Sequence, residues 1–231
     1  MSMFDRLLDL LYPPKCVFCS ALLQADEQYF CRACGEQLPL AEGGKLCRKG
    51  THFDRCVAPL YYRDMVRQSI HGYKFHGKTW RAATYAALMR PYVQKEFPRL
   101  DVVTWMPLTA KGKRKRGYDQ AELLARKLAK ELHLPCEKLL VKQRDTRQQS
   151  KLTQPAERRA NVLGAYALHK DAAVRERSIL LVDDVITSAS TLEEGARVLQ
   201  NALAGAVHCA AFAQAVGKSQ DTSCKTKTEP I

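Results

Sequence analysis

The sequence predicts an α/β protein with a mostly parallel sheet of about five strands, preceded by a small module that a metal stabilises. Two Cys-x-x-Cys pairs near the N-terminus predict the module. From residue 57 onward, short apolar runs alternate with stretches of helical periodicity, which is the pattern of βαβ units. The uninterrupted apolar run 179–182 predicts a strand buried on both faces of a parallel sheet.

Composition limits the class of protein. The chain has 231 residues, of which 46% are hydrophobic, so it can bury the core of one medium domain and carry a small appendage. Its formal net charge of +13 indicates an anionic partner such as a nucleotide, a polyphosphate or a nucleic acid, unless the charge serves solubility alone. Charged residues interrupt the first apolar positions, and the apolar stretch 202–217 falls short of a membrane-spanning helix. We therefore expect a cytoplasmic protein.

Cysteine spacing is the clearest feature of the N-terminal segment, after a short amphipathic helix expected at residues 3–11. Cys16 and Cys19 form one pair, Cys31 and Cys34 form the other, and eleven residues separate the pairs. Four thiolates at this spacing suit tetrahedral Zn²⁺, and a segment with so few core residues needs a metal to fold. A disulfide framework does not suit a cytosolic chain, and a redox Cys-x-x-Cys needs a βαβ setting. The sequence therefore predicts a structural zinc site.

A second zinc site stays an open question. Cys47 and Cys56 have no partner at Cys-x-x-Cys spacing, and together with His52 they offer three ligands. The alternative is a degenerate knuckle held by packing. Three further cysteines, at positions 136, 209 and 224, lack metal spacing and are expected to serve packing or the surface.

The first half of the α/β domain is expected to run as strand 57–62, helix 64–75, helix 79–97 and strand 101–106. Pro107 and Leu108 follow the last strand, and five cations in the run 111–116 lead into a helix through residue 132. Such a run is normally a solvated turn or a nucleic-acid-binding arm. Because it follows a parallel strand, we expect it to face the ligand edge of the sheet and to neutralise an anion there.

The stretch 179–191 combines a buried strand, two acids and a hydroxyl-rich turn into a helix. Asp183 and Asp184 are expected just past the strand, and the turn 187–191 supplies four hydroxyls and several backbone N–H groups. Ser190 and Glu193 have the spacing of a capping box. A helix start offers unpaired N–H donors and a positive dipole end, so the turn can hold a phosphate. The alternative is an ordinary strand, turn and capped helix with its acids in water.

This stretch resembles the phosphoribosyl pyrophosphate (PRPP) signature of the type I phosphoribosyltransferases, in which four apolar residues, two acids and two apolar residues precede a Thr/Ser-rich loop. The resemblance implies that Asp183 and Asp184 bind the ribose hydroxyls of PRPP. It also implies that the 5′-phosphate is cradled by Thr187, Ser188, Ala189, Ser190 and Thr191. Ala189 stands where the signature usually has glycine, which alanine can replace if its φ stays negative.

A second block resembles the ComF/GntX family, which joins N-terminal zinc knuckles to a type I phosphoribosyltransferase domain. The block is Pro107 followed by Arg114-x-Arg116-Gly-Tyr-Asp-Gln, although the family prefers Phe-Asn to the Tyr-Asp found here. The resemblance implies that Pro107 and Leu108 belong to the PRPP site. It implies further that Arg114 and Arg116 neutralise the leaving pyrophosphate.

A third block covers a polar segment, 143–159, which is expected to be a mobile loop. It looks like the family's flexible active-site loop, which makes it a lid candidate with residues Arg144, Thr146, Gln149 and Arg158. A last core strand is expected at 207–213 and a disordered tail at 218–231. The predicted domains are a zinc-ribbon-like module at 1–56 and a phosphoribosyltransferase-like domain at 57–217.

The family resemblance implies a protein that binds PRPP with Mg²⁺ and is linked to DNA uptake in natural competence or to nucleotide metabolism. If it is catalytic, it is a transferase that displaces pyrophosphate at ribose C1. The alternative is a non-catalytic factor that binds single-stranded DNA and docks a helicase or another competence protein through its zinc module. This alternative is favoured by the net charge, the cation run 111–116 and four aromatic residues that could stack on bases, Tyr73, Phe75, Trp80 and Tyr118. Aromatic residues at these spacings are, however, more often part of the core. The sequence names no acceptor base.

Overall fold

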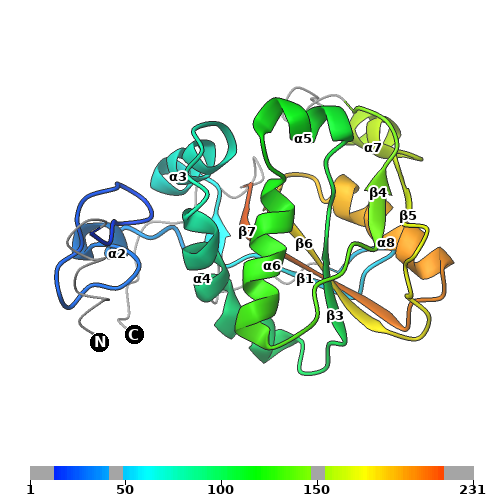
Figure 1. The fold of residues 1–231 in the computed structure, drawn as a ribbon, viewed down its shortest axis with the longest axis horizontal. Helices are drawn as coiled ribbons and strands as arrows, with labels where there is room; N and C mark the ends of the chain where they lie inside the picture. Colours follow the sequence, from blue (N-terminus) through cyan, green and yellow to red (C-terminus); the bar gives the residue numbers. More distant parts are fainter. Residues whose placement is uncertain (1–12, 42–48, 147–153, 216–231) are drawn as a thin grey trace.

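The computed structural model describes residues 13–41, 49–146 and 154–215 (Figure 1). Its main sheet has five strands, in the order β1-β7-β6-β3, with β2 also paired to β7. All of these pairings are parallel, which confirms the predicted α/β sheet. The strands are β1 (Arg55–Val57), β2 (Leu60–Tyr61), β3 (Val102–Trp105), β6 (Ser178–Ile186) and β7 (Ala206–Gln214). The helix expected at 3–11 and the tail expected at 218–231 lie outside the described residues.

Helices cover both faces of the sheet, so alternate side chains of β6 enter two separate cores. Leu180 and Val182 belong to a core shared with α3 (Asp64–Phe75), α4 (Arg81–Glu96) and α6 (Gln120–Leu132). Ile179 and Leu181 belong to the other core, shared with α8 (Ser190–Asn201). Figure 1 shows α6 in front of the sheet and α8 on its right. None of the helices in the described ranges is long and apolar enough to cross a membrane.

The helices α5 and α7 and the strands β4 and β5 are short and lie outside the main sheet. The cation run forms the short helix α5 (Ala110–Arg116), which Thr109 caps by accepting the Gly112 N–H at 3.0 Å and which Gly117 ends at φ 82°. α7 (Pro155–Val162) lies in the predicted lid region, and both α5 and α7 are at the top of Figure 1. β4 (Leu140–Lys142) pairs antiparallel with β5 (Tyr166–Leu168) outside the main sheet.

The N-terminal segment packs against α3 and α4. Val17 is fully buried in the core that these helices share. Ser69 Oγ donates to Val17 O at 2.6 Å, and Arg81 Nη2 donates to Ser20 Oγ at 3.0 Å. Figure 1 shows the cysteine-bearing segment with α2 (Arg32–Gly35) at the left end of the molecule, beyond α3 and α4. The N-terminal segment is therefore attached to the α/β domain by a buried interface as well as by the covalent connection of the chain.

Candidate functional site

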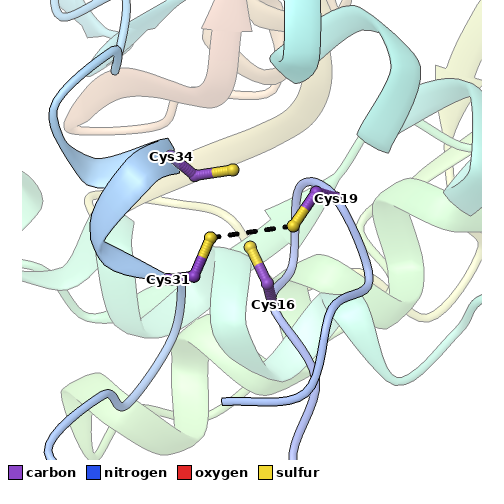
Figure 2. A group of neighbouring side chains, drawn as sticks. All are labelled: Cys16, Cys19, Cys31 and Cys34. Atoms are coloured by element: carbon purple, nitrogen blue, oxygen red, sulfur yellow. Dashed lines mark hydrogen bonds between the residues drawn. The ribbon is translucent and has the colours of Figure 1, made fainter. Parts of the chain in front are cut away.

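The four predicted zinc ligands, Cys16, Cys19, Cys31 and Cys34, converge in the structure (Figure 2), with all four Sγ atoms within 4.8 Å of one another. Cys19 Sγ lies 3.7 Å from Cys31 Sγ. Thiolates bound to one tetrahedral Zn²⁺ at about 2.3 Å lie roughly 3.8 Å apart, so this set of donors fits the ion. Burial acts to raise the pKa of Cys16, but backbone N–H groups that donate to its sulfur lower the pKa to about 7, which favours its thiolate. Burial raises the pKa of Cys19 and Cys34, so zinc itself has to displace the protons of these two thiols.

The other candidate metal ligands do not join this cluster. Cys56 is buried in β1, in register with Cys209 of β7. His52 contacts Glu193 through its backbone N–H and its ring, and Cys47 lies outside the described residues. Within 13–41, 49–146 and 154–215, the four cysteines form the single group of three or more His, Cys, Asp or Glu side chains that could hold an ion.

The two acids lie inside a strand, whereas the sequence predicted them just past it. β6 continues through both to Ile186, because the apolar pattern resumes after the acids and pairs with β7. Asp184 is buried and forms an ion pair with Lys74 of α3, with Nζ 2.7 Å from Oδ1. Burial, reinforced by the Asp184 charge, raises the pKa of Asp183 to about 7. At neutral pH, Asp183 is therefore only partly ionised.

Both acids line a cavity of about 840 Å³ at the carboxyl edge of the sheet, a volume typical of small-molecule sites. The other predicted site residues in its lining are Pro107, Leu108, Arg116, Thr146, Thr187 and Thr191. Four lysines stand on the same walls, at positions 74, 111, 115 and 142. The cavity thus combines two carboxylates, which can accept hydrogen bonds from a diol, with cations that can bind an anion.

Two features of the loop between β6 and α8 differ from what the sequence indicates. Ala189, just before α8, has φ 58° and ψ −4°, so the negative φ under which alanine can replace glycine is not found. This left-handed conformation costs an alanine about 1–2 kcal/mol. The expected capping box of Ser190 and Glu193 is also wrong, because the Glu193 carboxylate accepts two N–H groups from a distant turn, those of Thr51 and His52.

One side of the cavity carries Lys111, Lys115 and Arg116 and is called the basic wall. Asp119 holds the backbone on this side of the cavity. Its buried carboxylate accepts the Leu108 N–H at 2.8 Å and the Glu122 N–H at 3.3 Å, which fixes the turn after β3 and caps α6. Burial raises the pKa of Asp119, against these hydrogen bonds. Arg116 donates to Gln120 Oε1 at 2.7 Å and lines the cavity. Arg114 is exposed on α5 outside the lining, so the structure brings one of the two predicted arginines to the cavity.

The predicted lid residues come from both sides of the segment 147–153. Thr146 lines the cavity and accepts from Lys142 Nζ at 2.8 Å. Arg144 Nη2 donates to Leu163 O at 2.8 Å, and Arg158 lies on α7. Gln149 lies outside the described residues.

Sequence reasoning missed two lysines that face the acids. Lys74 lies in the last turn of α3. Burial acts to lower the pKa of Lys74, but the Asp184 carboxylate holds this pKa above its ordinary value. Lys142, on β4, lies with Nζ 5.2 Å from the centre of the Tyr166 ring, and burial lowers its pKa against the charge of Asp183. Neither lysine stands in a motif, so the amino-acid sequence offers no local signal for either.

A parallel sheet with an acid pair, a hydroxyl-rich loop and a basic cavity at its carboxyl edge defines a phosphoribosyltransferase-like domain. The sequence matches the phosphoribosyl transferase domain over residues 119–229 and the double zinc ribbon domain over residues 7–60. The predicted resemblance to the ComF/GntX family is thereby confirmed, and the ribbon match together with the cysteine cluster supports structural zinc.

Three curated proteins illustrate this relationship. Competence protein F of Haemophilus influenzae is 28% identical over 199 residues, which cover 81% of this chain and 79% of that protein. DNA utilization protein YhgH of Escherichia coli K12 is 28% identical over 83% of this chain and 86% of its own length. Competence protein ComFC of Bacillus subtilis is 24% identical over 84% of this chain and 82% of its own length.

Among solved structures, adenine phosphoribosyltransferase from Leishmania tarentolae aligns with a TM-score of 0.40 and 12% identity, over 84% of this chain and 77% of that one.

Proposed function

We propose that this protein binds PRPP, with the ribose hydroxyls on Asp183 and Asp184 and the 5′-phosphate in the loop 187–191. The observation that carries the proposal is that the acids, Thr187 and Thr191 line one cavity at the carboxyl edge of a parallel sheet. Carboxylates accept strong, charge-assisted hydrogen bonds from hydroxyls. The first turn of α8 offers backbone N–H groups and a positive dipole end to a phosphate.

The pyrophosphate of PRPP would lie against the basic wall. Arg116 and Lys115 belong to that wall, and Pro107 and Leu108 line the same cavity. Arg114 would add charge from outside the lining. Carboxylates and phosphate oxygens are the ligands that Mg²⁺ prefers, so the acid pair fits that ion, which would supply further charge neutralisation on PRPP when bound.

Phosphoribosyl transfer in this cavity would need no protein nucleophile. A bound acceptor would attack ribose C1 and release pyrophosphate, and the chain would contribute positioning and charge. Arg116 would stabilise the leaving group, and the segment 143–159 would close over the ligand to exclude water. Lys74 pairs with Asp184, so the ribose hydroxyls would share or replace this partner.

The names of the relatives support a place in natural competence and DNA utilization. A second function, binding of single-stranded DNA with a partner docked on the zinc ribbon, is favoured by one surface. Helix α5 exposes four cations next to the cavity, at positions 111, 113, 114 and 115. Phe75 beside it is 52% exposed, with the Arg116 guanidinium 5.2 Å from its ring centre. Aromatic rings and cations of this kind bind the bases and the backbone of single strands.

A calorimetric titration separates the two functions. PRPP titrated with and without Mg²⁺ should give saturable, Mg²⁺-dependent binding, and an excess of single-stranded oligonucleotide should leave it unchanged if DNA uses another surface. Steeply salt-dependent DNA binding with no heat from PRPP would instead favour the DNA-binding factor.

A further inference from the structure

Glu193, in the first turn of α8, ties the end of the loop 187–191 to the turn 50–53 through its side chain. Glu193 Oε1 accepts the Thr51 N–H at 2.9 Å, and Oε2 accepts the His52 N–H at 3.0 Å and lies 3.3 Å from the His52 ring nitrogen Nδ1. Thr51 and His52 belong to the turn 50–53, which leads into β1 of the main sheet, and the next residue, Asp54, donates its N–H to Val207 O of β7 at 2.8 Å. One carboxylate thus clamps two consecutive backbone groups that are more than a hundred residues away in sequence.

The turn that Glu193 holds is built for this approach. A Cβ atom on Gly50 would lie 2.4 Å from Glu193 Oε1, so only glycine lets the backbone come this close without displacing the carboxylate. Phe53, at the end of the turn, is 3% exposed and shares a core with Leu192 of α8. The clamp is therefore a close-packed contact, and both of its sides are fixed in the fold.

The clamp stands one helical turn from the strained residue of the loop. Glu193 N–H donates to Ala189 O at 2.8 Å, and Ala189 has the left-handed conformation described above. The methyl side chain of Ala189 cannot cap the helix, so no side-chain hydrogen bond of its own holds this residue in place. A non-glycine residue keeps such a conformation only where the surrounding structure holds it there.

We propose that Glu193 is a positioning residue through which the turn 50–53, just before β1, holds the phosphate loop in its binding conformation. This inference rests on the proposed function, because it assigns the 5′-phosphate to the loop. It predicts that the turn 50–53 sets the affinity for the phosphate end of the ligand. The basic wall, which would take the pyrophosphate, does not depend on the clamp.

The test compares three ligands on four variants. Glu193→Ala removes the clamp from the α8 side, Gly50→Ala displaces it from the side of the turn, and Glu193→Gln keeps one acceptor oxygen. We expect Glu193→Ala and Gly50→Ala to weaken binding of ribose 5-phosphate and PRPP about tenfold, and Glu193→Gln to have a smaller effect. Binding of inorganic pyrophosphate should stay unchanged. Glu137→Ala, which breaks a comparable pair with Arg177 at the opposite edge of the sheet, should alter neither.

Rescue by glycine distinguishes positioning from general destabilisation. Glycine adopts the left-handed conformation without strain, so Ala189→Gly should restore most of the ribose 5-phosphate affinity lost in Glu193→Ala. Hydrogen exchange of the amides of 188–191, measured without ligand, should speed up in Glu193→Ala and slow again in the double variant. Unchanged exchange, or an equal loss of pyrophosphate binding, would overturn the proposal. If the parent protein binds neither PRPP nor ribose 5-phosphate, the proposed function fails, and the exchange data still decide whether the clamp holds the loop.

Discussion

Lys74 Nζ lies 2.7 Å from Asp184 Oδ1, which joins the last turn of α3 to the middle of the ligand edge. The ion pair places a positive charge beside two neighbouring carboxylates in a partly buried site. It lowers the pKa of Asp183, but less than burial and Asp184 raise it. The protonation of Asp183 therefore depends on a residue from a different part of the chain.

The first prediction concerns pH. Because the pKa of Asp183 is about 7, the carboxylate that accepts ribose hydrogen bonds is lost as the pH falls through this value. PRPP affinity should decline by up to about tenfold per pH unit below 7. The raised pKa also means that protonated Asp183 favours the folded state, so this stabilisation is present at acid pH and is lost as the pH rises through 7. Binding and denaturant unfolding measured between pH 5 and 8 on the parent and Asp183→Asn check both trends, which should flatten in the variant.

The second prediction removes the cation. Lys74→Gln should move the pH midpoint of PRPP binding upward, because Asp183 loses a charge that lowers its pKa. The measurement is PRPP affinity against pH, with the exposed Lys127→Gln on α6 as the control. A midpoint equal to that of the parent would show that Lys74 does not govern the pKa of Asp183.

The third prediction concerns the backbone of the loop. Ala189→Gly should stabilise the protein by about 1 kcal/mol, because glycine relieves the left-handed strain. Ala160→Gly on the exposed side of α7 is a control of opposite sign and should destabilise its helix by about 1 kcal/mol. Chemical denaturation measures both, and a loss of stability in Ala189→Gly would contradict the strain.

The fourth prediction concerns the metal. Purified protein should carry zinc at the cysteine cluster, and Cys16→Ser should lose it and unfold the ribbon. Because Val17 shares the core of α3, we expect the loss to loosen α3 as well, which hydrogen exchange can follow. Cys136→Ser lies outside the cluster and should keep its zinc. Zinc-free parent protein, as shown by elemental analysis after reduction, would contradict the site.

Local patterns predict the elements of this fold well. The helix expected at 64–75 has these bounds in the structure, because Val66, Ile70 and Tyr73 recur at helical spacing and are fully buried. The strand expected at 57–62 is instead split into β1 and β2. Pro59 lies in the break, and proline has no N–H to donate to a neighbouring strand. The zinc ligands were predictable because their spacing alone specifies the donors.

Long-range contacts account for what the sequence did not predict. Glu193 has the spacing of a capping residue, but the turn at Thr51 and His52 offers it two backbone donors that no local pattern shows. Lys74 likewise looks like an ordinary polar position near the end of a helix. Its pairing with Asp184 exists because α3 packs across the edge of the sheet. The roles assigned to the site residues stay predictions until ligand binding is measured.

The most direct test of PRPP binding is a calorimetric titration of PRPP, in Mg²⁺, into the parent protein and Asp184→Asn. The variant keeps the shape of the side chain but loses a charged acceptor, so the account predicts a loss of about 1.5–3 kcal/mol in binding free energy. Thr187→Val, which removes one neutral donor, should cost less, and the exposed Asp171→Asn should cost nothing. An affinity of Asp184→Asn within a few tenths of a kcal/mol of the parent would contradict the claim that the acid pair binds the ribose of PRPP.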